Sequence, residues 1–176
     1  MKVNRGKDFE SAVKEGFEKI PNTSVYRIPD QMSYRSGSKN PCDFLVYHRP
    51  NLYALECKSV YGNTLPFSNV SEYQWTELLK MSRIPGVVAG VLCWYIEHDR
   101  TIFIPIQFLE VLKQNGAKSI RYDADKMTVR AIENNNFTII EIPGKKKRIL
   151  WEYQMDAMFQ TISSLTCSTI KEKESE

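Results

Sequence analysis

Three ionisable residues in the first half of the chain have types and spacing that could hold a divalent cation. Asp43 lies at the start of one expected strand, and Glu56 and Lys58 lie two residues apart in the next. Carboxylate oxygens are the ligands that Mg²⁺ and Mn²⁺ prefer. A cation held there could lower the pKa of a bound water and shield charge on a phosphate oxygen. Lys58 would stabilise the same charge or orient the water.

The relative positions of these three side chains follow from an expected β-hairpin. Strands are expected at 43–48 and 52–58, around the turn His48-Arg49-Pro50-Asn51. If the turn is centred on Arg49-Pro50, Asp43 lies directly opposite Glu56, with Cβ atoms roughly 4.5 to 5.5 Å apart. Because side chains alternate along a strand, Glu56 and Lys58 also share one face.

Two opposed carboxylates need an explanation, because like charges facing each other in a sheet are destabilising. The repulsion is a few kcal/mol at ~4 Å if the effective dielectric is about 20. A divalent cation would reverse the sign of that energy, and the Cys57 carbonyl could supply a further oxygen ligand. The alternative is an acidic pair on an exposed face, with Lys58 as an ordinary salt-bridge partner.

Two further residues are candidates for the same site. Glu10 lies on the polar face of the first expected helix, where it is either a third acidic ligand or a solvated charge. Gln74 lies on or beside the apolar stripe of the second helix, where an uncharged polar group needs a partner. A role in binding the metal or its water and a capping or backbone hydrogen bond are both open for Gln74.

Basic residues near these positions are candidates for contacts with DNA phosphates. They are Arg5 and Lys7 in the first helix, Arg35 and Lys39 before the Asp43 strand, and the stretch 145–148. Each neutralised phosphate would add salt-sensitive affinity. The stretch 145–148 is more consistent with solvated surface, as most charge runs are.

The elements expected around the site alternate between helices and strands. Helices are expected at 5–19, 71–83 and 106–114, strands at 24–28, 43–48, 52–58, 87–95 and 101–105, and extended segments at 137–142 and 148–151. A closing helix is marked by Trp151, Met155, Met158, Phe159, Ile162 and Leu165. This order predicts a mixed α/β (α+β) fold in which helices flank a central mixed β-sheet.

Length and composition predict one globular domain over residues 1–165, followed by a charged, disordered tail at 166–176. The net charge is only +3, from 24 basic and 21 acidic residues, so DNA contacts must come from local patches. Four separated cysteines indicate reduced thiols rather than a zinc site. No leader or membrane-spanning segment is recognised, so we expect a soluble cytoplasmic protein without a membrane partner. The sequence has no Gly-rich phosphate loop, and we expect no small-molecule cofactor.

Several short motifs occur together in one order along the chain. They are Asn4-Arg5-Gly6, Glu10, Asp43-Phe44, Glu56-Cys57-Lys58, Thr64-Leu65-Pro66-Phe67, Gln74 and Lys118-Ser119-Ile120-Arg121. Through them the chain resembles the RecU-type Holliday-junction resolvases of the PD-(D/E)XK nuclease superfamily. The resemblance implies a restriction-endonuclease-like core. It also implies that Asp43, Glu56 and Gln74 hold Mg²⁺ and that Lys58 stabilises the transition state.

The resemblance further implies a homodimer that resolves four-way DNA junctions by paired symmetric nicks in recombination or repair. The sequence departs from the family at Pro41, where a threonine is frequent, and in the segment 30–40, where the family has a long projection. A general structure-selective or restriction-like nuclease therefore remains an alternative, as does a DNA-binding module that has lost cleavage. A cellular and a phage origin are both open.

Overall fold

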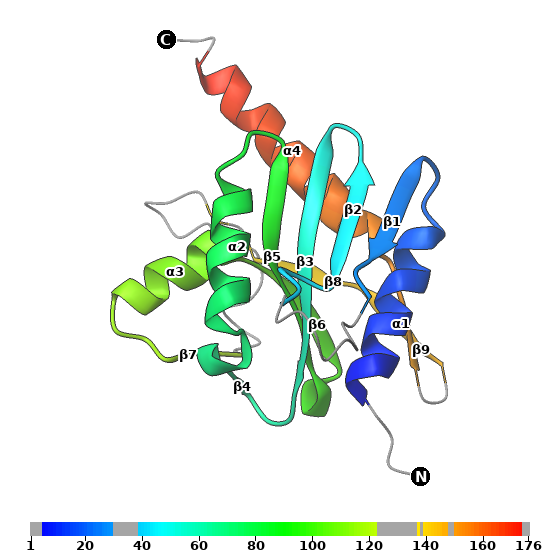
Figure 1. Cartoon of the computed structure of the whole chain (residues 1–176). Helices are drawn as coiled ribbons and strands as arrows, with labels where there is room; N and C mark the ends of the chain where they lie inside the picture. The colour runs from blue at the N-terminus through cyan, green and yellow to red at the C-terminus, as the bar shows by residue number, and fades with distance from the viewer. Residues whose placement is uncertain (1–4, 30–38, 123–136, 138, 148–149, 174–176) are drawn as a thin grey trace.

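The computed structural model describes residues 5–29, 39–122, 137, 139–147 and 150–173 (Figure 1). The helices are α1 (Arg5–Glu18), α2 (Glu72–Ser82), α3 (Ile106–Gln114) and α4 (Asp156–Lys173), with short 3₁₀ turns at Phe67–Asn69 and Ile96–His98. The strands are β1 (Thr23–Arg27), β2 (Phe44–His48), β3 (Asn51–Val60), β4 (Thr64–Pro66), β5 (Val87–Tyr95), β6 (Arg100–Pro105), β7 (Ser119–Arg121), β8 (Ile140–Ile142), β9 (Gly144–Lys147) and β10 (Leu150–Tyr153).

A six-stranded mixed sheet forms the centre of the molecule, in the order β1-β2-β3-β5-β6-β8. The β3–β5 pair is parallel, and the other neighbours are antiparallel. From Ala89 to Tyr95 every residue of β5 is buried, because elements cover both faces of this central strand. The expected mixed α/β architecture is confirmed, and α1, β1, β2, β3, α2 and β5 follow one another as expected for a restriction-endonuclease-like core.

The β2–β3 hairpin has the register expected from its turn. Phe44 pairs with Leu55 at one end of the ladder, and His48 pairs with Asn51 at the other. The side chains of β3 then alternate between two hydrophobic clusters. Ala54 belongs to the cluster under α2 and α3, whereas Leu55 belongs to the cluster under α1 and α4. Glu56 and Lys58 therefore share the face covered by α2, as predicted.

Each face of the sheet is covered by helices with apolar stripes. On one face, α1 buries Phe9, Val13 and Phe17, which recur at helical spacing, and α4 adds Met158. On the other face, α2 buries Trp75 and Leu78, and α3 buries Phe108 and Leu109. The N-terminal ends of α1 and α2 lie at the same edge of the sheet as the carboxyl end of β3 (Figure 1).

The C-terminal part differs from the expectation in two ways. Trp151 lies in β10 of a β9–β10 hairpin, and the closing helix begins only at Asp156. The helix then continues to Lys173, past residue 166 where the charged tail was expected to begin, and the expected disorder of that tail stays a prediction. Extending a helix costs less than starting one, and lysine and glutamate are good helix formers. No helix among the described residues is long and apolar enough to cross a membrane.

Candidate active site

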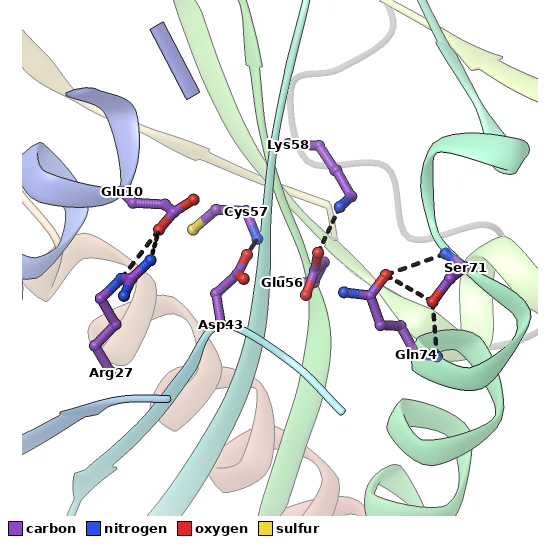
Figure 2. Close-up of polar contacts among 8 residues, drawn as sticks. All are labelled: Glu10, Arg27, Asp43, Glu56, Cys57, Lys58, Ser71 and Gln74. Atoms are coloured by element: carbon purple, nitrogen blue, oxygen red, sulfur yellow. Dashed lines mark hydrogen bonds and ion pairs between the residues drawn. The ribbon is translucent and has the colours of Figure 1, made fainter. Parts of the chain in front are cut away.

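Asp43 is held rigidly where β2 meets its two neighbouring strands. Its amide donates to the Leu55 carbonyl at 3.0 Å, and its carbonyl accepts from the Ile28 amide at 2.8 Å. The paired ladder ends at Phe44, so Asp43 does not form the ladder pair with Glu56 that the hairpin arithmetic gave. Instead its Oδ2 accepts from the Cys57 amide at 2.7 Å (Figure 2). The carboxylate thus satisfies a β3 amide that has no β2 partner.

Glu56 is the one fully buried acid among the described residues, with 0% of its surface exposed. Its Oε1 accepts from Lys58 Nζ at 2.5 Å, whereas its Oε2 is buried without a hydrogen-bond partner. Burial, with a further contribution from the charge of Asp43, raises the pKa of Glu56 to about 7, although Lys58 and an interaction with the Gln74 side chain oppose the rise. A buried carboxylate oxygen without a partner is costly, so the site is incomplete as a purely structural cluster.

The pKa of Asp43 is also raised, chiefly by burial and also by the nearby charge of Glu10. The Cys57 amide, Lys58 and Arg27 act in the opposite direction. The charge of Asp43 raises the pKa of Glu56, and the charge of Lys58 lowers the pKa values of both acids. The three residues predicted from the hairpin therefore lie close enough to interact electrostatically, as Figure 2 shows.

Gln74 reaches the site but uses its oxygen to cap α2. Gln74 Oε1 accepts from the Ser71 amide at 3.1 Å and from Ser71 Oγ at 3.0 Å, while Ser71 Oγ accepts from the Gln74 amide. This capping box leaves the side-chain amide nitrogen pointing toward Glu56 (Figure 2). Of the two roles left open by the sequence, the structure has the capping one. A metal-ligand role would require the amide to rotate and stays a prediction.

Glu10 lies on the α1 side of Asp43 and is paired with Arg27. Arg27 donates from Nε at 3.0 Å and from one terminal nitrogen at 2.6 Å, both to Glu10 Oε2. Because Glu10 also raises the pKa of Asp43, it belongs to the electrostatic surroundings of the site. The pairing with Arg27 shows that Glu10 is more than a solvated charge. Nothing in the sequence pattern indicated this partner, since the two residues come from different elements.

Cys57 contributes its backbone to the site, and its thiol faces the core. The thiol lies in the cluster under α1 and α4, and burial raises its pKa well above the usual value. In an antiparallel sheet the N–H and C=O of one residue point the same way. Because the Cys57 amide reaches Asp43, the Cys57 carbonyl also points past the end of β2. The role of this carbonyl as a cation ligand stays a prediction.

The predicted DNA-contacting residues are only partly described. Arg5 and Lys7 lie on the exposed first turn of α1, and Lys39 is exposed before β2. Arg35 lies outside the described residues. In the basic hairpin, Lys146 pairs with Asp99 at 2.5 Å and Lys147 with Glu152 at 2.6 Å. These two lysines are already neutralised locally, which favours the solvated-surface interpretation for that stretch.

The donors present fit a hard divalent cation. In the described part of the chain, no three His, Cys, Asp or Glu side chains gather in a metal-binding arrangement. A cation here would take Asp43 and Glu56, with carbonyl, amide or water oxygens as its other ligands. One or two carboxylates plus water is the set that Mg²⁺ ordinarily takes. The unpartnered Glu56 Oε2 supplies an oxygen suited to that role.

Comparisons with known proteins find similarity only to solved structures, and the one described below is at low identity. No protein-family model and no curated protein matches the chain. Among solved structures, it is similar to Hjc, a Holliday junction resolvase from the archaeal hyperthermophile Archaeoglobus fulgidus. The two share 18% identity at a TM-score of 0.45, over 77% of this chain and 88% of that chain. The resemblance to RecU-type resolvases in particular stays a prediction.

Proposed function

We propose that the chain is a Mg²⁺- or Mn²⁺-dependent DNA endonuclease that acts through Asp43, Glu56 and Lys58. The observation that carries the proposal is the buried Glu56 carboxylate, which has one oxygen on Lys58, the other unpartnered, and a second carboxylate beside it. Buried polar groups that serve only the fold are nearly always hydrogen-bonded. Strongly perturbed acids with a specific charge partner are typical of functional sites.

Each residue has a role that follows from its contacts. Asp43 and Glu56 would hold the cation, and the Cys57 amide orients the Asp43 carboxylate. A divalent cation there would supply Lewis-acid stabilisation of phosphate charge and acidify a water molecule. Lys58 is 23% exposed, so its ammonium faces both the buried acid and the solvent from which a phosphate would approach. It would stabilise the charge that grows on the phosphate during attack.

We further propose that the substrate is branched DNA, with four-way junctions cut by paired symmetric nicks. One set of these residues hydrolyses one strand at a time, so two matched cuts need two sites related by a two-fold axis, and hence a homodimer. The motif resemblance supports this reading. The short segment at 30–40 leaves less chain to enter a junction centre, so we expect a relaxed rather than strict preference for junctions.

One set of assays tests these proposals. Cleavage would be measured on a four-way junction and on a duplex of the same arm sequence, with Mg²⁺, Ca²⁺ or EDTA, and the oligomeric state by light scattering. We expect a dimer that cuts the junction faster in Mg²⁺, binds in Ca²⁺ with little cutting, and is inactive in EDTA. Full activity in EDTA would reject the metal mechanism.

The same assays separate the alternatives. A monomer that cuts both substrates equally is a general nuclease. Tight junction binding without cleavage in either metal identifies a DNA-binding module that has lost its activity.

A further inference from the structure

Tyr61 is an exposed aromatic residue directly beyond β3, the strand that carries Glu56 and Lys58. It follows the last residue of β3, three positions after Lys58. Its side chain is 64% exposed, the largest fraction among the exposed large hydrophobic side chains in the described residues. An exposed aromatic beside a perturbed acidic site is a candidate for contact with a ligand, since aromatic rings are enriched where proteins bind partners.

The turn that carries Tyr61 is fixed by contacts from elsewhere in the fold. Gly62 has a φ of 73°, which reverses the chain toward β4 with a conformation that favours glycine. The next residue, Asn63, accepts from the Tyr122 amide at 2.6 Å through its carbonyl and contacts His98 Nε2 at 2.7 Å through its side chain. Tyr61 is therefore presented on an anchored backbone, which lowers the entropy cost of binding through its ring.

Arg5 covers one part of this ring. Its guanidinium carbon lies 5.1 Å from the centroid of the Tyr61 ring, within the distance for a cation–π contact. Arg5 begins α1, whose N-terminal end lies at the edge of the sheet where β3 ends (Figure 1). A guanidinium stacked in this way keeps N–H donors for phosphate oxygens. The pair combines an aromatic ring with a phosphate-binding cation at one edge of the molecule.

We infer that Tyr61 and Arg5 form a stacking site for an unpaired base of the DNA strand that is cut, an inference that rests on the proposed function. Single-stranded nucleic acid is bound by this combination of basic groups and aromatic platforms. Tyr61 lies ~10 Å beyond Lys58 along the chain, from a rise of about 3.3 Å per residue. That span equals about three base steps at 3.4 Å each. A base within a duplex is already stacked on both sides, so the pair would select unpaired bases near the cut.

The competing interpretation is structural, with Tyr61 covering Arg5 and steadying the start of α1. The two interpretations differ in what a phenylalanine does and in which DNA is affected. Stacking needs the ring alone, and it concerns only substrates with unpaired bases. A structural role would alter stability and change the binding of every DNA substrate together.

The test uses Asp43→Asn protein, which would bind DNA without cutting, as the parent for Tyr61→Ala and Tyr61→Phe. The control is Tyr47→Ala, because Tyr47 is also exposed, at 48%, but lies near the β2–β3 turn at the far end of β2 from Asp43. Affinity would be measured for a fork with unpaired bases and for a fully paired duplex. A 2-aminopurine in the unpaired arm would report stacking through its fluorescence.

We expect Tyr61→Ala to bind the fork about tenfold more weakly and the duplex unchanged, with loss of the 2-aminopurine quenching. Tenfold corresponds to 1.4 kcal/mol, which lies within the range for one base on an aromatic ring. Tyr61→Phe and Tyr47→Ala should match the parent. Equal losses on fork and duplex, or a phenylalanine variant as weak as the alanine one, would overturn the inference. If the Asp43→Asn parent binds both fork and duplex and Tyr61→Ala changes neither affinity, only the stacking site is rejected. If the parent binds no DNA, the proposed function is rejected as well.

Discussion

Two glutamates in different regions lie beside lysines, and their pKa values move in opposite directions. Glu152, on the β9–β10 hairpin, bonds Lys147 at 2.6 Å and also Lys19 of the segment after α1. Those hydrogen bonds lower its pKa to about 2. Glu56 has Lys58 as its ion-pair partner and is buried, and its pKa rises to about 7.

The difference indicates that burial, more than a neighbouring cation, decides whether the pKa of a carboxylate lies above or below its ordinary value. Glu152 keeps contact with water and has a cation for each oxygen, so ionisation suits the folded state. Glu56 loses water, gains one cation and faces Asp43. The ion pairs of Glu152 connect the β9–β10 hairpin to the segment after α1. The buried Glu56, in contrast, places an unfavourable carboxylate environment at the candidate catalytic centre.

The largest expected effect is on cleavage by variants of the two acids. Asp43→Asn and Glu56→Gln should each lower the cleavage rate about 10³-fold or more, because each would remove a proposed cation ligand from a site that acts as a unit. Glu152→Gln should leave the rate unchanged. The measurement is single-turnover cleavage of a four-way junction, with circular dichroism to confirm folding. Near-normal cleavage by either site variant would remove Asp43 and Glu56 from the mechanism.

A somewhat smaller loss is expected at Lys58. Lys58→Ala should reduce cleavage by about 10²- to 10³-fold, because one donor focused on developing charge commonly contributes that much. Lys58→Arg keeps the charge and should retain part of the activity. DNA affinity measured in Ca²⁺ should change little in either variant. If Lys58→Ala lost binding and cleavage in the same proportion, Lys58 would be a DNA-contacting residue rather than a transition-state stabiliser.

Removing the buried charge should raise stability in the metal-free protein. Because the folded-state pKa of Glu56 lies above the ordinary value of 4.5, the folded state holds the proton more tightly. The stability that comes from protonated Glu56 is fully present below pH ~4.5 and is lost as the pH rises through about 7. At pH 8, Glu56→Gln should be roughly 1 to 3 kcal/mol more stable than the natural chain. The upper limit follows from the size of the rise in the pKa of Glu56.

Urea unfolding in EDTA from pH 4.5 to pH 8 would measure this difference. The difference in unfolding free energy between the two proteins should widen with pH. It should close again when Mg²⁺ is added, since on the proposed mechanism the cation would stabilise only the natural site. A Glu56→Gln variant that is less stable at pH 8 would show that the buried carboxylate contributes favourably to the fold.

The smallest effect is expected on the melting temperature when the exposed Glu152 loses its ion pairs with Lys147 and Lys19. The lowered pKa of Glu152 means that its contribution is present above pH ~4.5 and is lost as the pH falls toward about 2. Glu152→Gln should therefore melt slightly earlier at pH 7 in low salt, with the difference vanishing at pH 2 and in 1 M salt. Thermal melts under these conditions would check it. A melting difference that persists in high salt would indicate a packing role for Glu152.

The core of the site was predictable because local rules are enough to place it. The two-residue period of a strand puts Glu56 and Lys58 on one face, and the position of the turn brings Asp43 to the same end of the hairpin. The capping box was also readable from Ser71 and Gln74, which stand three positions apart before an apolar stripe. Spacing alone does not choose between the capping role and a metal role, because both partners lie within reach of the same side chain.

What the sequence by itself determined is α1, α2, α3 and the first five strands of the main sheet, and the face shared by Glu56 and Lys58, since these depend on short-range periodicity and turn chemistry. Only the tertiary structure decided which neighbours meet these residues. The pairing of Glu10 with Arg27, the approach of Arg5 to Tyr61 and the unpartnered oxygen of Glu56 all join distant parts of the chain. Burial depends on how whole elements pack, and burial is the largest cause of the raised pKa values, so the electrostatic character of the site emerged only with the fold.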